Sequence, residues 1–126
     1  MNALEAAKVA EAALEDKLGE DIKVLDLRGL SNIADCFVIA SGKNANQLHA
    51  MANEVEQKLF QQGVKLHHSE GYSGGTWILL DFGNLLVHLF NREEREFYGL
   101  DHVWGDAKAL CFLVISITYN ENRIFK

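Results

Sequence analysis

The sequence predicts an α/β fold of the α+β type, in which a mixed five-stranded sheet carries helices mainly on one face. Two long amphipathic segments, at 3–18 and 45–62, alternate with short apolar runs of strand character. The last two runs, 76–82 and 85–90, are separated by the dipeptide Gly83-Asn84, which is typical of a β-hairpin turn. Crossover helices give parallel strand pairs and a hairpin gives an antiparallel pair, so a sheet that contains both is mixed.

Three helices are predicted by a shared pattern at their ends. An asparagine stands three residues before a glutamate or glutamine at Asn2, Asn44 and Asn91, which resembles a capping box with Asn in place of Ser or Thr. Each segment ends at a glycine, which tolerates the left-handed conformation that closes a helix. These glycines are Gly19, Gly63 and Gly99. The helices are therefore expected at about 3–18, 45–62 and 92–98.

Five strands are expected around these helices. The run 22–27 alternates along the chain, and Phe37–Ala40 is apolar throughout, which is typical of a central strand buried on both faces. The run 64–68 has the weakest strand pattern. The two hairpin strands complete the sheet, and one domain is expected to cover residues 1–108.

The two faces of the hairpin carry different side chains, because successive strand residues point to opposite sides. A purely apolar set is expected to meet the helices: Ile78, Leu80, Phe82, Leu85, Val87 and Leu89. The opposite set mixes aromatic, aliphatic and polar residues: Trp77, Leu79, Asp81, Leu86, His88 and Phe90. Large apolar side chains with a few polar groups on an open face are typical of a recognition surface. A covering helix, such as the third one, explains the same pattern equally well.

Charge and composition narrow the classes of function. The 126 residues include 12 Lys and Arg and 18 Asp and Glu, so the net charge is −6. This acidity argues against binding DNA or another phosphate backbone directly, and it favours a basic partner. Two cysteines far apart in the chain make no disulfide framework, which indicates a reducing compartment. Neither a signal-peptide pattern nor an apolar run of the roughly 20 residues of a membrane span is visible, so a cytoplasmic protein is expected.

The residues that carry chemistry do not assemble into a catalytic or metal-binding pattern. The carboxylates Asp26, Asp35 and Asp81 are isolated, without the Asp-x-Asp or Asp-x-Glu pair that holds magnesium ions. The glycines of 71–75 lack the lysine and hydroxyl of a phosphate-binding loop. The five histidines show no metal-ligand spacing, and nothing local supports a Cys/His nucleophile pair. We therefore expect no catalytic residue, no metal and no cofactor.

Three motifs, in this order, resemble the ribosomal silencing factor family, also called the RsfS or Iojap family. The first is Ser31–Gly42, with the sequence SNIADCFVIASG. The central motif joins Glu70-Gly71 to Trp77–Gly83 and Val87–Phe90. The closing motif joins Arg95–Tyr98 to Val103–Ala107, so the resemblance spans about residues 1–108.

The resemblance implies a translation repressor that is not an enzyme. Members of the family bind ribosomal protein fourteen of the large ribosomal subunit and sterically prevent the small subunit from joining, which lowers translation under nutrient limitation. Their fold is similar to nucleotidyltransferases, without the acidic metal-binding pair. The candidate partner-binding residues are Trp77, Leu79, Asp81, His88, Phe90, Arg95, Tyr98 and Trp104. Trp77 is expected to be the anchor of this interface and to be partly exposed in the free protein.

Two other functions remain open. A divergent nucleotidyltransferase-like enzyme that binds a nucleotide is one, and the missing acidic pair argues against it. A homodimeric interaction module whose open sheet face pairs with itself is the other. The C-terminal extension 109–126 departs from the family pattern, because Leu110–Tyr119 is strongly apolar. An added strand, self-association and poor order are all compatible with this extension.

Overall fold

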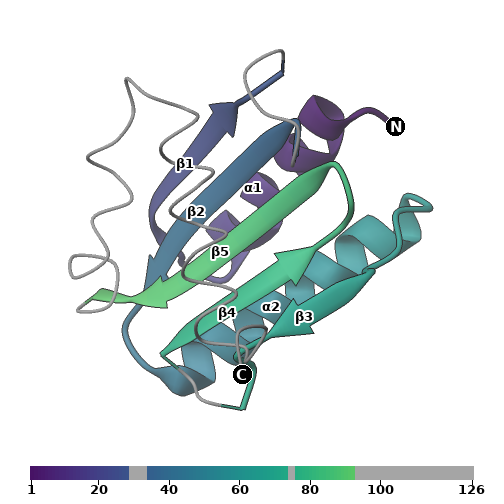
Figure 1. Ribbon diagram of the computed structural model, residues 1–126. Coiled ribbons are helices and arrows are strands. Elements are labelled where there is room, and N and C mark those ends of the chain that lie inside the picture. The colour runs from purple at the N-terminus through teal and green to yellow at the C-terminus, as the bar shows by residue number, and fades with distance from the viewer. Residues whose placement is uncertain (29–33, 74–75, 93–126) are drawn as a thin grey trace, which may run out of the picture.

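The computed structural model describes residues 1–28, 34–73 and 76–92 (Figure 1). The elements in chain order are α1 (Ala3–Asp16), β1 (Glu20–Asp26), β2 (Cys36–Gly42), α2 (Ala45–Gln61), β3 (His68–Glu70), β4 (Trp77–Asp81) and β5 (Leu85–Asn91). The five strands form one sheet in the order β1-β2-β5-β4-β3. Strands β2 and β5 are parallel and the other three pairs are antiparallel. The predicted mixed five-stranded sheet is confirmed.

Both described helices lie on the same face of the sheet (Figure 1). The main core fills the space between them and the strands, and it contains the whole apolar set that the hairpin was predicted to turn toward the helices. Strand β2 lies between β1 and β5, and all seven of its residues are buried. This confirms the prediction of a central strand buried on both faces.

The helix starts follow the predicted capping chemistry. Asn2 Oδ1 accepts a hydrogen bond from Glu5 N at 2.8 Å, and Glu5 Oε1 accepts one from Asn2 N at 2.9 Å, so α1 begins with a complete capping box. At α2, Asn44 Oδ1 accepts from Gln47 N at 2.9 Å. The Gln47 side chain instead accepts from Lys43 N and donates to Leu18 O at 2.9 Å, which ties the start of α2 to the end of α1.

The end of α1 and the position of β3 differ from the predictions. Leu18, not Gly19, takes the left-handed conformation after α1, with φ of 61°, and the residue is 78% exposed. The strand predicted at 64–68 is found at His68–Glu70. Val64 N donates a hydrogen bond to Leu59 O, which closes the end of α2. The chain therefore begins to pair with β4 later than predicted, at His67, whose backbone N donates to Asp81 O.

Several predictions fall outside the described residues. They concern the glycines at 74 and 75, the start of the first family motif at 31–33, most of the third helix at 92–98, and the extension 109–126. Within the described part of the chain, neither helix is long and apolar enough to span a membrane.

Candidate partner-binding site

The sheet side opposite α1 and α2 is called the second face here. It carries a second apolar cluster, separate from the helix-side core: Leu25, Leu27, Ala34, Phe37, Ile39, Trp77, Leu79, Leu86 and Phe90. His88 joins this face because it pairs with Leu79 across the hairpin and with Ile39 on β2. The predicted division of the hairpin into a helix-facing set and an opposite set is therefore confirmed.

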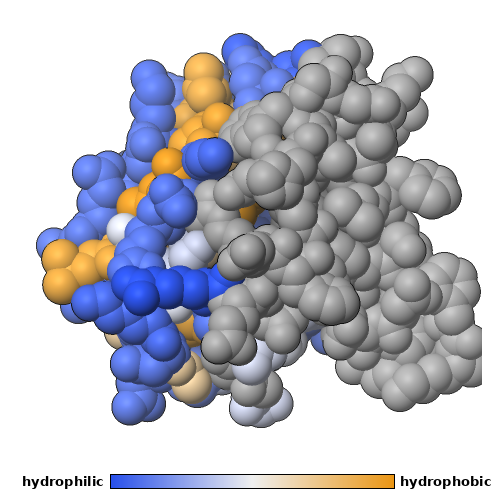
Figure 2. Space-filling view, turned by 90° about the vertical axis from the view of Figure 1, so that its left-hand side faces the viewer, coloured by the Kyte–Doolittle hydropathy of each residue, from blue (hydrophilic) through white to orange (hydrophobic). Residues whose placement is uncertain are grey.

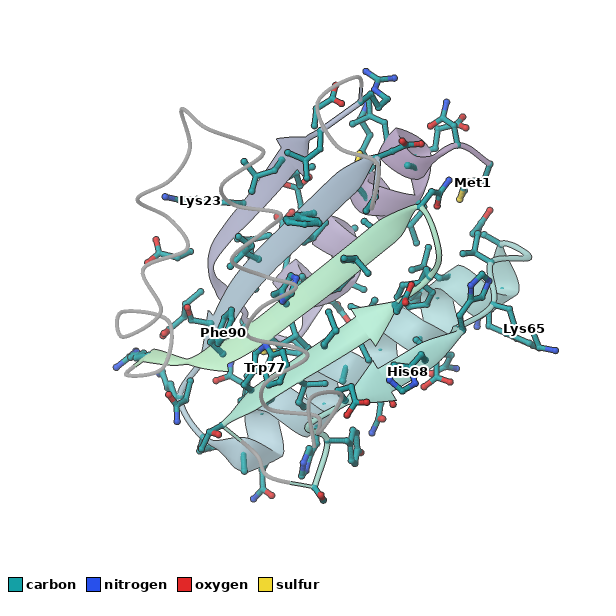
Figure 3. All side chains as sticks on the ribbon, in the orientation of Figure 1. Met1, Lys23, Lys65, His68, Trp77 and Phe90 are labelled. Carbon is teal, nitrogen blue, oxygen red and sulfur yellow. The ribbon has the colours of Figure 1, made fainter. Side chains whose placement is uncertain are left out.

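Four rings form a row across β4, β5 and β2 on the second face. Trp77 is paired with Phe90 across the hairpin, and their ring centroids are 6.4 Å apart at an interplanar angle of 22° (Figure 3). Phe90 stacks on His88 at 6.1 Å, and His88 meets Phe37 edge to face at 5.5 Å. We call these residues the aromatic row. Their side chains are anchored on three adjacent strands, so the row is held rigidly, and all four residues are buried.

Trp77 is buried, with only 6% of the residue exposed, so the prediction that it is partly exposed is wrong. One side of its ring is stacked on Phe90. The backbone at Gly71 encloses it further, because a Cβ at Gly71 would lie 3.5 Å from Trp77 Cε3 and would collide with the Trp77 carbonyl oxygen. This contact was not predictable from the sequence, because Gly71 and Trp77 are six positions apart.

The polar atoms of the aromatic row are buried without hydrogen bonds. Within residues 1–28, 34–73 and 76–92, the buried side-chain nitrogens that lack a partner are Trp77 Nε1 and both nitrogens of His88. Burial lowers the pKa of His88 to about 3, so the imidazole is neutral at physiological pH. An unpaired buried donor or acceptor costs roughly 1–3 kcal/mol, so these groups destabilise the free fold.

Asp81 stands at the opposite end of β4 from Trp77, where it pairs with Leu86. Its Oδ1 accepts a hydrogen bond from Gly83 N at 2.7 Å, so one carboxylate oxygen holds the hairpin turn. The residue is half-buried, which leaves the rest of the carboxylate near solvent. Asp81 therefore has a structural role that the sequence did not predict, beside its predicted place on the second face.

The sequence also did not predict an ion pair that crosses the sheet. Arg92 Nε donates to Glu20 Oε1 at 2.6 Å, which connects the end of β5 to the start of β1 across β2. This hydrogen bond lowers the pKa of Glu20 and raises that of Arg92. The two residues are 72 positions apart, and only the strand order brings them together. The other predicted residues, Arg95, Tyr98 and Trp104, lie outside the described residues.

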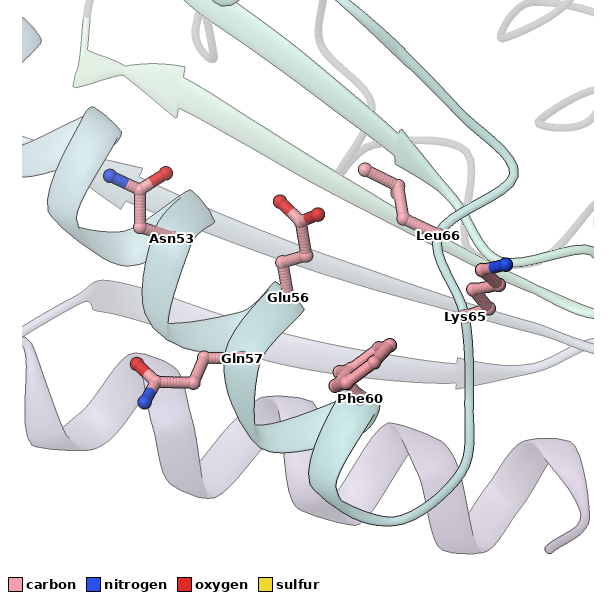
Figure 4. Close-up of a pocket in the computed structure, with 6 residues that line it drawn as sticks. All are labelled: Asn53, Glu56, Gln57, Phe60, Lys65 and Leu66. Atoms are coloured by element: carbon pink, nitrogen blue, oxygen red, sulfur yellow. The ribbon is translucent and has the colours of Figure 1, made fainter.

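The described residues were searched for a metal-binding group and for an activated nucleophile. They contain no group of three His, Cys, Asp or Glu side chains that could hold a metal ion. Burial raises the pKa of the Cys36 thiol, which is unfavourable for a nucleophile. A depression of about 410 Å³ lies beside α2, away from the aromatic row, and the exposed ring of Phe60 forms one wall (Figure 4).

The described surface on the β1 side is mostly hydrophilic, with a band of apolar residues running through it (Figure 2). Fold and site together define the class: a small α+β protein whose sheet face carries an aromatic row with unpaired polar atoms.

Comparison with known proteins identifies the family. The chain matches the family model for the ribosomal silencing factor during starvation, RsfS, over residues 1–123. It is 39% identical to the ribosomal silencing factor RsfS of Bacillus subtilis over 107 residues, which cover 85% of this chain and 91% of that protein. It is 32% identical to the chloroplastic protein Iojap of Arabidopsis thaliana over 105 residues, 83% of this chain and 43% of that protein.

A solved structure agrees with these matches. The crystal structure of protein CV0518 from Chromobacterium violaceum superposes with a TM-score of 0.79 at 37% identity, and covers 83% of this chain and 88% of that one. The chain therefore belongs to the ribosomal silencing factor family, as its three motifs predicted. This membership connects the protein to translation regulation at the ribosome.

Proposed function

We propose that this protein binds the large ribosomal subunit through its ribosomal protein fourteen and sterically blocks joining with the small subunit, which represses translation under nutrient limitation. The observation that carries the proposal is the family match over residues 1–123. The protein acts by occupying a surface and catalyses no reaction. It works in the cytoplasm, where ribosomal subunits meet.

The second face is the proposed docking surface. Tryptophan is enriched among the residues that dominate binding energy, and the aromatic row places Trp77 on a rigid support. A partner that accepts from Trp77 Nε1 and pairs with His88 would form hydrogen bonds that the free protein lacks. Leu79, Asp81 and Phe90 complete the described part of the surface. Arg95, Tyr98 and Trp104 are the proposed contacts from outside it.

Charge supports the same partner. The protein carries a net charge of −6, and a ribosomal protein that binds RNA is expected to be basic. Complementary charges accelerate encounter and favour a single orientation of docking. The acidic chain is at the same time poorly suited to bind the RNA of the subunit directly.

Sedimentation and subunit joining test the proposal together. Purified large subunits are pelleted with the protein through a sucrose cushion, and small subunits are then added while joining is followed by light scattering. We expect co-sedimentation at one protein per subunit and a dose-dependent loss of joining. Phe60→Ala is the matched control, because Phe60 is 64% exposed on α2, away from the second face, and should behave like the wild type.

Two outcomes contradict the proposal. Absence of co-sedimentation rejects binding to the large subunit, and normal joining at saturating protein rejects the steric mechanism. A calorimetric titration with ATP and magnesium examines the enzymatic alternative separately. Saturable binding of ATP would favour the hypothesis of a nucleotidyltransferase-like enzyme over a protein that acts only by occupying a surface.

A further inference from the structure

Strand β3 has few contacts of its own to hold it in the sheet. It has only three residues, lies at one edge of the sheet, and pairs with β4 alone among the described strands. His68 and Ser69 are exposed and Glu70 is half-buried, so apolar packing of these side chains adds little. A short edge strand of this kind opens easily, because few buried contacts and ladder hydrogen bonds resist its movement. Contacts made by the residues that follow β3 are therefore expected to determine its position.

Tyr72, which follows shortly after the end of β3, is attached to α2 by three interactions. Its ring stacks on the His49 imidazole, with centroids 4.3 Å apart at an interplanar angle of 15°. His49 Nε2 donates a hydrogen bond to Tyr72 O at 2.5 Å, and the Tyr72 hydroxyl donates to Asn53 Oδ1 at 3.2 Å. His49 and Asn53 are one helical turn apart, so both lie on the same side of α2. We call Tyr72, His49 and Asn53 the tyrosine clamp.

The residue between β3 and the tyrosine clamp, Gly71, packs against Trp77. An added Cβ at Gly71 would collide with the Trp77 carbonyl oxygen and would lie 3.5 Å from Trp77 Cε3, so the two backbones are in close contact. Gly71 adopts φ of +79°, which helps to set the direction in which the chain leaves β3 for α2. Tyr72 is bonded directly to Gly71, and the peptide unit between them is planar and stiff. A displacement of Tyr72 therefore moves the backbone that lies against Trp77.

We propose that Tyr72 is a positioning residue for Trp77: the tyrosine clamp holds Gly71 against Trp77 and thereby fixes the indole ring on the second face. Its importance for ribosome binding rests on the proposed function, whereas its effect on the indole depends on this chain alone. Tyr72 packs on α2, which covers the other face of the sheet, so it acts on the partner through Trp77. Tyr72 is 41% exposed, and hydrogen bonds near solvent contribute little net stability. Loss of the clamp is therefore expected to change Trp77 locally without unfolding the protein.

The indole of Trp77 reports the effect of the tyrosine clamp directly. In a Trp104→Phe background, Trp77 is the only tryptophan, so its Nε1–H gives a single NMR signal and its emission reports its own surroundings. Tyr72→Ala should shift this NMR signal and increase acrylamide quenching about twofold, because local opening exposes a buried ring. Tyr72→Phe keeps the stacked ring and should restore the wild-type values. The matched control, Phe60→Ala, removes an exposed ring from α2 outside the clamp and should change neither.

A second variant loosens the clamp while Tyr72 stays in place. His49→Ala removes the stacked imidazole and the donor to Tyr72 O, so it should shift the Trp77 signal in the same direction as Tyr72→Ala. The double variant should shift the signal by less than the sum of the two, because both residues form one stack. If Tyr72→Ala unfolds, as seen by circular dichroism, His49→Ala decides alone. A Trp77 signal that is unchanged in the folded variants overturns the positioning role.

Binding to purified large subunits tests whether the clamp acts through Trp77. With Trp104 intact, Tyr72→Ala should bind about fivefold more weakly than the wild type, because a displaced anchor loses part of its contacts. In a Trp77→Phe background the same change should cost less, since the indole N–H that the clamp positions is already absent. Equal losses in the two backgrounds overturn action through Trp77. Absence of binding by the wild type rejects the proposed function instead, and the Trp77 signal then decides the positioning role alone.

Discussion

At the scale of single residues, His88 stands out among the residues that the structure describes. Its imidazole is buried in the aromatic row with both nitrogens unpaired, and burial lowers its pKa to about 3. A phenylalanine ring would fill much of the same space without a desolvated polar atom. The histidine therefore reduces the stability of the free fold. We expect it to contribute instead to binding of the partner.

The titration of His88 predicts how stability changes with pH. The unfolded chain takes up a proton on this histidine near its ordinary pKa of 6.5, whereas the folded chain does so only near 3. Between these values the unfolded state holds one more proton, so stability falls as pH falls, by up to about 1.4 kcal/mol per pH unit.

Urea unfolding of the wild type and of His88→Phe from pH 7 to pH 4 measures this effect. The variant should be equally stable or about 1 kcal/mol more stable at pH 7. The gap between the two proteins should widen toward pH 4 in favour of the variant. A gap that is independent of pH would show that the folded histidine is protonated normally.

Trp77 needs a milder substitution than alanine, because it is buried. Trp77→Ala should lower the free energy of unfolding by about 3–5 kcal/mol, so a loss of binding would be ambiguous. Trp77→Phe keeps an aromatic ring beside Phe90 and removes the unpaired Nε1 donor. We expect its stability to fall by less than about 1.5 kcal/mol.

Binding of Trp77→Phe to large subunits should weaken about tenfold, which corresponds to one lost hydrogen bond of about 1.4 kcal/mol. Equilibrium sedimentation at several protein concentrations measures the affinity, with Phe60→Ala as the control. Wild-type affinity in Trp77→Phe would mean that the indole N–H does not contact the partner.

At the scale of elements, the backbone at Gly71, directly after β3, packs closely against Trp77 of β4. This glycine has φ of +79°, and an added Cβ would collide with the Trp77 carbonyl oxygen. Gly63 has a similar φ of +83°, but nothing lies within 4 Å of its Cβ position. The two glycines therefore separate the cost of the backbone conformation from the cost of the collision.

Gly71→Ala is predicted to be much more destabilising than Gly63→Ala. The left-handed conformation costs an alanine roughly 1–2 kcal/mol at either position. The collision at Gly71 should add about 2 kcal/mol, because backbone must move and the Trp77 strand shifts with it. Urea unfolding of both variants measures the difference, and equal losses of stability would show that the loop adapts freely.

The hairpin turn allows a similar comparison at Asp81. Asp81→Asn keeps an oxygen that can accept from Gly83 N, so stability should be unchanged, while binding to a basic partner should weaken about tenfold or more. Asp81→Ala removes the acceptor and should also cost about 1 kcal/mol of stability. Thermal unfolding and large-subunit sedimentation on both variants separate the turn from the interface. Full binding by Asp81→Asn would limit this carboxylate to its role in the turn.

The elements that depend on local chemistry were predictable from the sequence. Asn2 and Asn44 cap the two helices, and the hairpin follows from Gly83-Asn84. Its division into two faces follows from strand alternation alone. The parts that depend on distant contacts were not predictable: the enclosure of Trp77 by Gly71, the Arg92–Glu20 ion pair, and the place where 64–70 joins the edge of the sheet.

At the scale of the whole molecule, the acidic charge and the apolar second face are expected to affect different steps of binding. Apolar contact and hydrogen bonds act after docking and determine mainly how slowly the complex dissociates. The net charge of −6 acts at longer range and determines mainly how fast a basic partner is met. Screening reduces the second effect, since the Debye length is about 8 Å at physiological salt.

The association rate with large subunits is therefore predicted to fall as salt rises, with a smaller change in the dissociation rate. A surface-based binding assay between about 50 and 300 mM salt measures both rates. The double variant Glu15→Gln and Glu56→Gln lowers the net charge from −6 to −4 at exposed positions on α1 and α2, away from the second face. Its association rate should be lower at low salt and should depend less on salt, with an unchanged dissociation rate. The same salt dependence in the wild type and the double variant would show that docking is guided by local contacts on the second face, because the overall charge would then have no effect on encounter.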